Sequence, residues 1–257
     1  MDVLGILLFP GYAFVVAASL FYEWVDRKVF ARVQHRMGPA YVGPFGVLQP
    51  FADLVKLLCK ESVVPEGVDR TLFTLAPPAL LVTQLLASLL LPVMAPEGLA
   101  SFEGDLVVAA ALMALTMVLV LTAGWASSNR FAAVGSERGG LQMVAYEIPL
   151  TLTLVSAALA AGSLRISEIV RYQAAHAPFL LSVPGVLAFP VYLLAAQAEL
   201  ERQPFDIPEA EQELAGGWCV EYSGWRLAMI RLAHDVETFF LSGLAAALFL
   251  GGPPLPG

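Results

Sequence analysis

The sequence is poor in charged residues. Of its 257 residues, 58% are hydrophobic and only 14% are Asp, Glu, Lys or Arg. Soluble globular domains carry about 25% charged residues. The composition therefore excludes an ordinary soluble domain and indicates a protein that lies in a membrane.

Cysteine is scarce as well. The chain contains only Cys59 and Cys219, with no CxxC pair and no histidine near either of them. Iron–sulfur and zinc sites need several such ligands, so this chain alone cannot build one. Neither a GxGxxG motif nor a phosphate loop is present. We expect no cofactor or metal bound by this chain alone, and any electron carriers must belong to another subunit.

The chain instead contains several long hydrophobic segments. A helix of about 20 apolar residues spans a bilayer. Six runs reach or approach this length, namely Val3–Tyr22, Thr71–Ala95, Leu106–Ser128, Leu141–Ala161, Ala177–Ala198 and Thr238–Gly251, the last beginning among Arg231–Glu237. The first run lacks a basic segment and a cleavage site, so we interpret it as a mature helix. The sequence predicts an all-α polytopic membrane protein with one membrane domain over residues 1–257.

Lysine and arginine predict the orientation of this domain. If the first helix ends in the cytoplasm, 12 of the 14 basic residues lie on that side, and only Arg165 and Arg171 lie opposite. Cytoplasmic loops carry an excess of Lys and Arg. We therefore expect a multi-pass protein of a prokaryotic plasma membrane with its N-terminus outside.

The first predicted cytoplasmic loop covers residues 23–70. Arg27–Arg36 is basic with apolar residues at helical spacing, which is typical of an amphipathic helix on the membrane surface. Gly-Pro turns follow it. Apolar residues then return at i, i+3, i+4 and i+7 within Phe51–Leu58, which predicts a second surface helix.

The second predicted cytoplasmic loop, residues 199–237, is acidic. Its first 23 residues hold seven carboxylates: Glu199, Glu201, Asp206, Glu209, Glu211, Glu213 and Glu221. Acids crowded in this way repel one another, so some should hold protons where water is scarce. The alternative is a solvated acidic loop without such a role. We expect Glu201 to pair with its neighbour Arg202 and to be dispensable.

Local motifs shape this loop. Asp206-Ile-Pro-Glu209 resembles a capping box, so a helix that begins there would place Glu209 and Glu213 on one face. Gly216-Gly217 provides a hinge.

If the fourth membrane helix begins at Leu141, Glu147 lies two turns in, or about 9 Å along its axis. An acid at that depth is a candidate functional residue, the alternative being a glutamate that reaches the interface.

Four segments carry a family resemblance. Residues 26–61 (DRKVFARVQHRMGPAYVGPFGVLQPFADLVKLLCKE), 124–135 (GWASSNRFAAVG), 142–149 (QMVAYEIP) and 198–224 (AELERQPFDIPEAEQELAGGWCVEYSG) resemble the H-type membrane subunit of respiratory complex I. The family includes complex I-like dehydrogenases and, in altered form, energy-converting membrane hydrogenases. The resemblance covers residues 23–252. The family usually has eight membrane helices, with Glu at the position of Asp26 and Ser at that of Ala145.

The resemblance implies a subunit that anchors a soluble redox arm to a membrane arm and forms the floor of a quinone chamber at the interface with its partners. It places six residues at this chamber: Arg27, Arg32, Arg36, Asp53, Phe205 and Asp206. It places six acids on a proton path that begins there: Glu147, Glu199, Glu209, Glu211, Glu213 and Glu221.

The implied activity is that of a proton-translocating quinone oxidoreductase, to which this chain contributes no redox centre and no catalytic residue. The implied partners are iron–sulfur and large redox-arm subunits, antiporter-like and small membrane subunits, and the lipid bilayer, with no nucleic acid. The electron donor stays open among NADH, ferredoxin, coenzyme F420 and other carriers.

Two alternatives stay open. One is the equivalent subunit of a group 4 energy-converting hydrogenase, without quinone. The complete GPAYVGPFGVLQP segment favours the quinone branch, whereas the Ser136–Gly140 stretch favours the hydrogenase branch. The other is a membrane carrier or scaffold. The sequence contains no internal repeat, which disfavours a secondary transporter.

Overall fold

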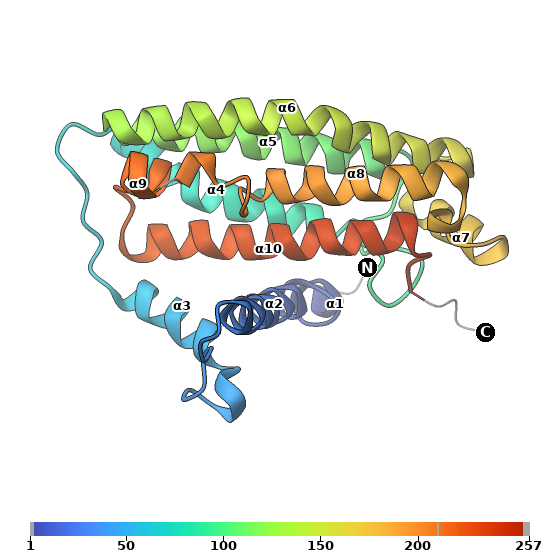
Figure 1. Cartoon of the computed structure of the whole chain (residues 1–257), viewed down its shortest axis with the longest axis horizontal. Coiled ribbons are helices and arrows are strands. Elements are labelled where there is room, and N and C mark those ends of the chain that lie inside the picture. The colour runs from blue at the N-terminus through green and yellow to red at the C-terminus, as the bar shows by residue number, and fades with distance from the viewer. Residues whose placement is uncertain (1–2, 210, 254–257) are drawn as a thin grey trace.

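The computed structural model describes residues 3–209 and 211–253, with side chains over residues 5–208 and 213–253, and this part of the chain consists of helices and loops (Figure 1). The α-helices are α1 (Val3–Leu7), α2 (Tyr12–Val33), α3 (Gln49–Cys59), α4 (Arg70–Ser88), α5 (Asp105–Ala126), α6 (Arg130–Ala161), α7 (Ile166–Ala175), α8 (Val183–Glu199), α9 (Glu211–Leu214) and α10 (Gly224–Phe249). Four short 3-10 turns are η1 (Pro44–Gly46), η2 (Phe179–Leu181), η3 (Ile207–Glu209) and η4 (Gly217–Cys219).

Five helical segments are long and apolar enough to cross a membrane. They are Gly5–Val33, Arg70–Ser88, Asp105–Ala126, Arg130–Ala161 and Gly224–Phe249. The sixth expected span corresponds to α8, an apolar helix of 17 residues. The prediction of an all-α polytopic membrane protein is confirmed.

Helix α10 is the central element of the bundle. It packs against α4, α2 and α3, while α6 packs against α5 and α8. One buried apolar cluster includes Leu150, Tyr192, Phe240 and Phe249, and a second surrounds Trp218. Because lipid chains are as apolar as these side chains, close packing and internal hydrogen bonds hold the helices together. The Tyr192 hydroxyl, for example, donates to the Leu241 carbonyl at 2.8 Å.

The first predicted surface helix is wrong. Helix α2 continues to Val33, 11 residues beyond Tyr22, so most of the Arg27–Arg36 segment is the end of the first membrane helix. No glycine or proline interrupts the chain between Tyr22 and Val33, and the helix ends just before His35, whose φ is 55°. The second predicted helix is confirmed, because α3 contains all of Phe51–Leu58, and its place on the membrane surface stays a prediction.

Two membrane helices begin earlier than the apolar runs indicate. Helix α6 starts at Arg130 rather than near Leu141, because the side chain of Asn129 caps it by accepting a hydrogen bond from the Phe131 backbone at 2.8 Å. Glu147 is consequently 17 residues into α6, or about 25 Å along its axis, rather than two turns. Helix α10 starts at Gly224, seven residues before Arg231.

The polar loops gather at one end of the bundle. Helices α3 and α9 lie at this end, whereas α7 lies at the other, near the described ends of the chain (Figure 1). After Asp206 the backbone forms only η3 and the four-residue helix α9. The side chains of Glu209 and Glu211 lie outside the described residues, so the expected shared face of Glu209 and Glu213 is not tested.

Candidate functional site

An open cavity of about 860 Å³ lies between α2, α8 and α10. Small-molecule sites usually occupy about 300–1,000 Å³ and combine apolar walls with a few polar groups. The charged residues on its lining are Glu23, Asp26, Arg27, Arg36, Arg202 and Asp235. Most of the other lining residues are apolar, among them Val29, Phe30, Leu193, Ala196, Leu241 and Ala245. This division suits an amphipathic ligand.

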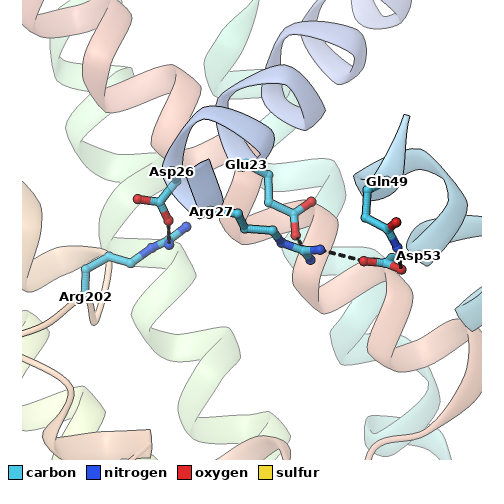
Figure 2. A network of polar contacts seen from close by, with 6 residues as sticks. All are labelled: Glu23, Asp26, Arg27, Gln49, Asp53 and Arg202. Carbon is cyan, nitrogen blue, oxygen red and sulfur yellow. Dashed lines mark hydrogen bonds and ion pairs between the residues drawn. The ribbon is translucent and has the colours of Figure 1, made fainter. Parts of the chain in front are cut away.

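One ion-pair network fixes α2 against α3 beside this cavity (Figure 2). The Arg27 guanidinium pairs with Glu23, one helical turn earlier, and donates to Asp53 at 2.6 Å. The Gln49 amide donates to the other Asp53 oxygen at 2.8 Å. Burial raises the pKa of Asp53, but the hydrogen bonds from Arg27 and Gln49 outweigh it and leave that pKa below its usual value.

A second ion pair connects α2 to the turn that follows α8. Asp26 and Arg27 are neighbours on α2 but point in opposite directions, so Asp26 faces Arg202 (Figure 2). The Arg202 guanidinium donates to Asp26 at 2.7 Å. The expected pairing of Arg202 with Glu201 is wrong, because successive side chains in this turn diverge. Arg202 reaches the cavity, and Glu201 points into the bundle.

Buried carboxylates form a second group of polar residues, next to the cavity. Glu199 at the end of α8 and Glu237 in α10 are 1% and 2% exposed. Glu199 interacts electrostatically with Glu237, Glu147 and Glu201. One carboxyl oxygen of Glu199 and one of Glu237 have no hydrogen-bond partner among the described residues. Because burying an unpaired charge is costly, these groups require protons or water.

Gln142 of α6 holds the turn that joins these groups. Its amide nitrogen donates to the carbonyl oxygens of Ala198 and Phe205, both at 2.8 Å. The ring of Phe205 packs edge-on against Tyr146, with 5.2 Å between centroids. The turn is thereby fixed on α6 at both of its ends.

The remaining predicted site residues are distributed over the same end of the molecule. Arg36 lines the cavity, Arg32 is exposed on the last turn of α2, and Asp206 is half-buried in its turn. Glu213 is exposed and pairs with Arg138 at 2.6 Å. Glu221 accepts a hydrogen bond from Asn129 at 2.5 Å. The predicted chamber and path residues therefore do not form a single cluster.

Sequence reasoning assigns no role to Glu23, Asp26, Asp235 and Glu237, which lie in or beside the two groups. Glu23 precedes Arg27 by four residues, the spacing of a helical ion pair, and this signal is visible in the sequence. The pairing of Asp26 with Arg202 joins residues 176 positions apart, and no local pattern predicts it.

Comparison with known proteins agrees with this architecture. The NADH dehydrogenase family model matches residues 6–257. The chain is 40% identical over 256 residues to the second H-type subunit of the NADH-quinone oxidoreductase of Syntrophobacter fumaroxidans, which covers 95% of this chain and 76% of the relative. The chain belongs to this family of H-type subunits.

Further relatives carry the same description. The H-type subunit of the Brevibacillus brevis enzyme is 41% identical over 247 residues, covering 96% of this chain and 71% of the relative. The first H-type subunit of the Geobacter metallireducens enzyme is 40% identical over 247 residues, covering 93% and 74%. The resemblance found in the sequence is confirmed, and this H-type chain is a multi-pass membrane subunit of a complex I-type oxidoreductase.

Proposed function

We propose that this H-type subunit forms part of a quinone chamber and the beginning of a proton path, and that it links a redox arm to a proton-pumping membrane arm. The observation that carries this proposal is the amphipathic cavity between α2, α8 and α10. A quinone combines a polar head with an apolar tail, and the relatives are described as NADH-quinone oxidoreductases. The cavity provides a surface for each part of such a molecule.

The charged residues at the cavity bind and orient the head group in this proposal. Arg27 and Arg202 are each held by a carboxylate, so their positions are set before a ligand arrives. Preorganised donors stabilise negative charge that appears during a reaction without further rearrangement. Electrons reach the quinone from partner subunits, and this chain supplies binding, orientation and proton exchange.

Proton exchange follows from the buried acids. Reduction of a quinone consumes protons and changes the charge in the chamber, which shifts the protonation of neighbouring carboxyls as a coupled set. Glu199 lies beside the cavity-lining residue Leu200 and interacts with Glu147 on α6. Charges inside the membrane are poorly screened, so a change at one acid is felt by the next.

The remaining parts of the proposal concern partners and orientation. The polar end, with α3 and α9, faces the cytoplasm, and the N-terminus lies outside, which follows the distribution of Lys and Arg. At this end the chain contacts iron–sulfur and large redox-arm subunits. Within the membrane it contacts antiporter-like and small subunits.

Blocking the cavity tests the quinone assignment. Ser242 is exposed on α10 and lines the cavity, so Ser242→Trp fills it without disturbing buried side chains. We expect quinone reduction by the purified complex to fall about tenfold, which equals about 1.4 kcal/mol, while donor oxidation by a soluble artificial acceptor is unchanged. Ala160→Trp, at an exposed position of α6 away from the cavity, is the matched control.

Wild-type quinone kinetics in Ser242→Trp would contradict the assignment. The partner large subunit provides an independent check, because the cysteine pairs of a nickel–iron site in that subunit would overturn quinone reduction in favour of the hydrogenase alternative.

The carrier alternative is tested with the isolated chain in liposomes. Solute flux without partner subunits would overturn the oxidoreductase assignment.

A further inference from the structure

Glu201 occupies a position that neither a surface loop nor an ion pair with its neighbour explains. Its backbone is left-handed, with φ at 50°, which is strained for a residue that carries a side chain. The residue is only 5% exposed. The left-handed backbone costs free energy, and so does the burial of the carboxyl group. A residue that carries both costs indicates a use for the buried acid.

Two structural features accommodate this carboxyl group. The indole nitrogen of Trp218, which is fully buried, donates to one Glu201 oxygen at 3.3 Å. Gly139 of α6 faces the other oxygen, and a Cβ at this glycine would lie 2.7 Å from it. The absence of a side chain at Gly139 therefore leaves room for the Glu201 carboxyl between α6 and Trp218.

The same carboxyl group is electrostatically connected to two other buried acids. Glu199 interacts with Glu201, and Glu237 of α10 also interacts with Glu201. Glu199 and Glu237 each have a buried carboxyl oxygen without a partner among the described residues. Gln142 holds the turn that carries Glu199 and Glu201 against α6. Three acids from two segments thus surround a region that requires protons or water.

We propose that Glu201 is a proton-carrying residue that connects the acidic loop between α8 and α10 to the buried carboxyls of Glu199 and Glu237. This inference rests on the proposed function and adds a residue to its proton path. In each step one O–H bond of the Glu201 carboxylic acid breaks and one forms on a neighbouring carboxylate, directly or through water. One proton moves, no electron moves, and Glu201 takes up its next proton from the loop side.

Other ionisable groups act on the same region and set its pH response. His234 of α10 lies with its ring 6.0 Å from that of Trp218 and its Nδ1 3.8 Å from the Glu237 carboxyl. Glu147 of α6 acts on Glu199. Arg202, the neighbour of Glu201, acts electrostatically on His234. A change at Glu201 should therefore alter the pH profile of the complex as well as its rate.

The test is Glu201→Gln in the assembled complex. Glutamine keeps an oxygen that accepts the Trp218 hydrogen bond but cannot carry a proton. We expect proton translocation and coupled quinone reduction to slow about tenfold, which equals about 1.4 kcal/mol in activation free energy. The redox-difference infrared spectrum should also lose a carboxylic-acid band. Glu137→Gln, an exposed glutamate two residues from Gly139 on α6, is the matched control.

The outcomes separate this inference from the proposed function. A wild-type complex that reduces quinone without proton translocation overturns the proton path and, with it, the role of Glu201, but leaves the quinone chamber in place. A coupled wild-type complex whose Glu201→Gln variant keeps the wild-type rate, pH profile and infrared spectrum overturns the role of Glu201 alone. If Glu201→Gln does not assemble, Glu201→Asp decides, because it keeps an acid at a different position. If the Glu201→Asp variant has the same pH profile as the wild type, the proposal is overturned.

Discussion

At the scale of the residue, the acids of this chain differ in how their charge is compensated. Asp53 accepts hydrogen bonds from Arg27 and Gln49, and Asp26 pairs with Arg202. Glu199 and Glu237 instead bury carboxyl oxygens without a partner among the described residues. Compensated carboxylates fix the geometry of the cavity. In the proposed proton path, the uncompensated ones take up and release protons.

The Asp53 pair gives a prediction with a defined pH dependence. Because its folded pKa is lowered, Asp53 contributes stability above the unfolded value of about 3.9, and this contribution is lost as the pH falls through the folded value. Both side chains of the Arg27–Asp53 pair are 34% exposed, so the contribution is below about 1 kcal/mol. We expect Asp53→Asn to speed hydrogen exchange in α3 at pH 7 by a few-fold.

At a pH below the folded pKa of Asp53, the wild type and Asp53→Asn should exchange at the same rate. Glu66→Gln, at an exposed site in the loop after α3, is the control and should leave α3 unchanged. Equal exchange in α3 for Asp53→Asn and the wild type at pH 7 would refute the stabilising role of this pair.

A second residue-scale prediction compares two acids of the proposed proton path. Glu147 acts on buried Glu199, whereas Glu213 is exposed with a side-chain exposure of 63% and pairs with Arg138. Exposed ion pairs contribute about 0–1 kcal/mol. We expect Glu147→Gln to suppress proton translocation and slow electron transfer about tenfold or more, and Glu213→Gln to have the smaller effect. Proton-to-electron ratios in reconstituted vesicles measure both, and a larger effect of Glu213→Gln than of Glu147→Gln would contradict this order.

At the scale of the element, the turn between α8 and η3 determines how the cavity and the buried acids meet. Gln142 fixes both ends of this turn on α6, and the turn sends Arg202 to α2 and Glu201 toward Trp218. The turn therefore connects α8 to α6 through the Gln142 amide and to α2 through the Arg202 guanidinium, while the Glu201 carboxyl group points the other way. Movement of this turn would change the cavity and the acid cluster together.

The Arg202–Asp26 pair tests that connection. Asp26→Arg and Arg202→Asp each place like charges against each other, so we expect each to lower quinone reduction by several-fold. The double exchange restores the pair with its direction reversed and should recover most of the activity, which double-mutant analysis expresses as a coupling energy. Additive losses in the double variant would show that the two residues act independently. Lys28→Asp, at a position of α2 that does not line the cavity, controls for the general loss of positive charge.

At the scale of the whole molecule, α2 runs at an angle to the axis shared by α4, α5, α6 and α10 (Figure 1). The cavity lies between α2, α8 and α10, and its lining on α10 runs from Asp235 to Ala245, in the half of that helix away from Gly224. Basic residues cluster at this end, and Arg165 and Arg171 belong to the α7 end. The distribution of charge thus defines one polar end of the bundle, and the cavity opens along the helices that lead from it.

Thiol labelling tests the orientation of the whole molecule. Cys59 is exposed at the end of α3. With Cys219 replaced by Ser, we expect a membrane-impermeant maleimide to label Cys59 in inverted vesicles but not in intact cells. A cysteine placed at the exposed position of Glu168 in α7, with Cys59 and Cys219 both replaced by Ser, should show the opposite pattern. Labelling of Cys59 from the outside of intact cells would reverse the predicted topology.

The sequence by itself determined the class of the protein. Its low charge and long apolar runs predict an all-α membrane protein, and four segments carry the family resemblance, because hydropathy and motifs are local properties. Only the tertiary structure decided that α2 extends to Val33, that Arg202 pairs with Asp26, and that Glu201 is buried beside Trp218. These features depend on contacts between residues far apart in the chain, and the direction of a side chain in a turn follows from backbone angles that composition and periodicity do not specify.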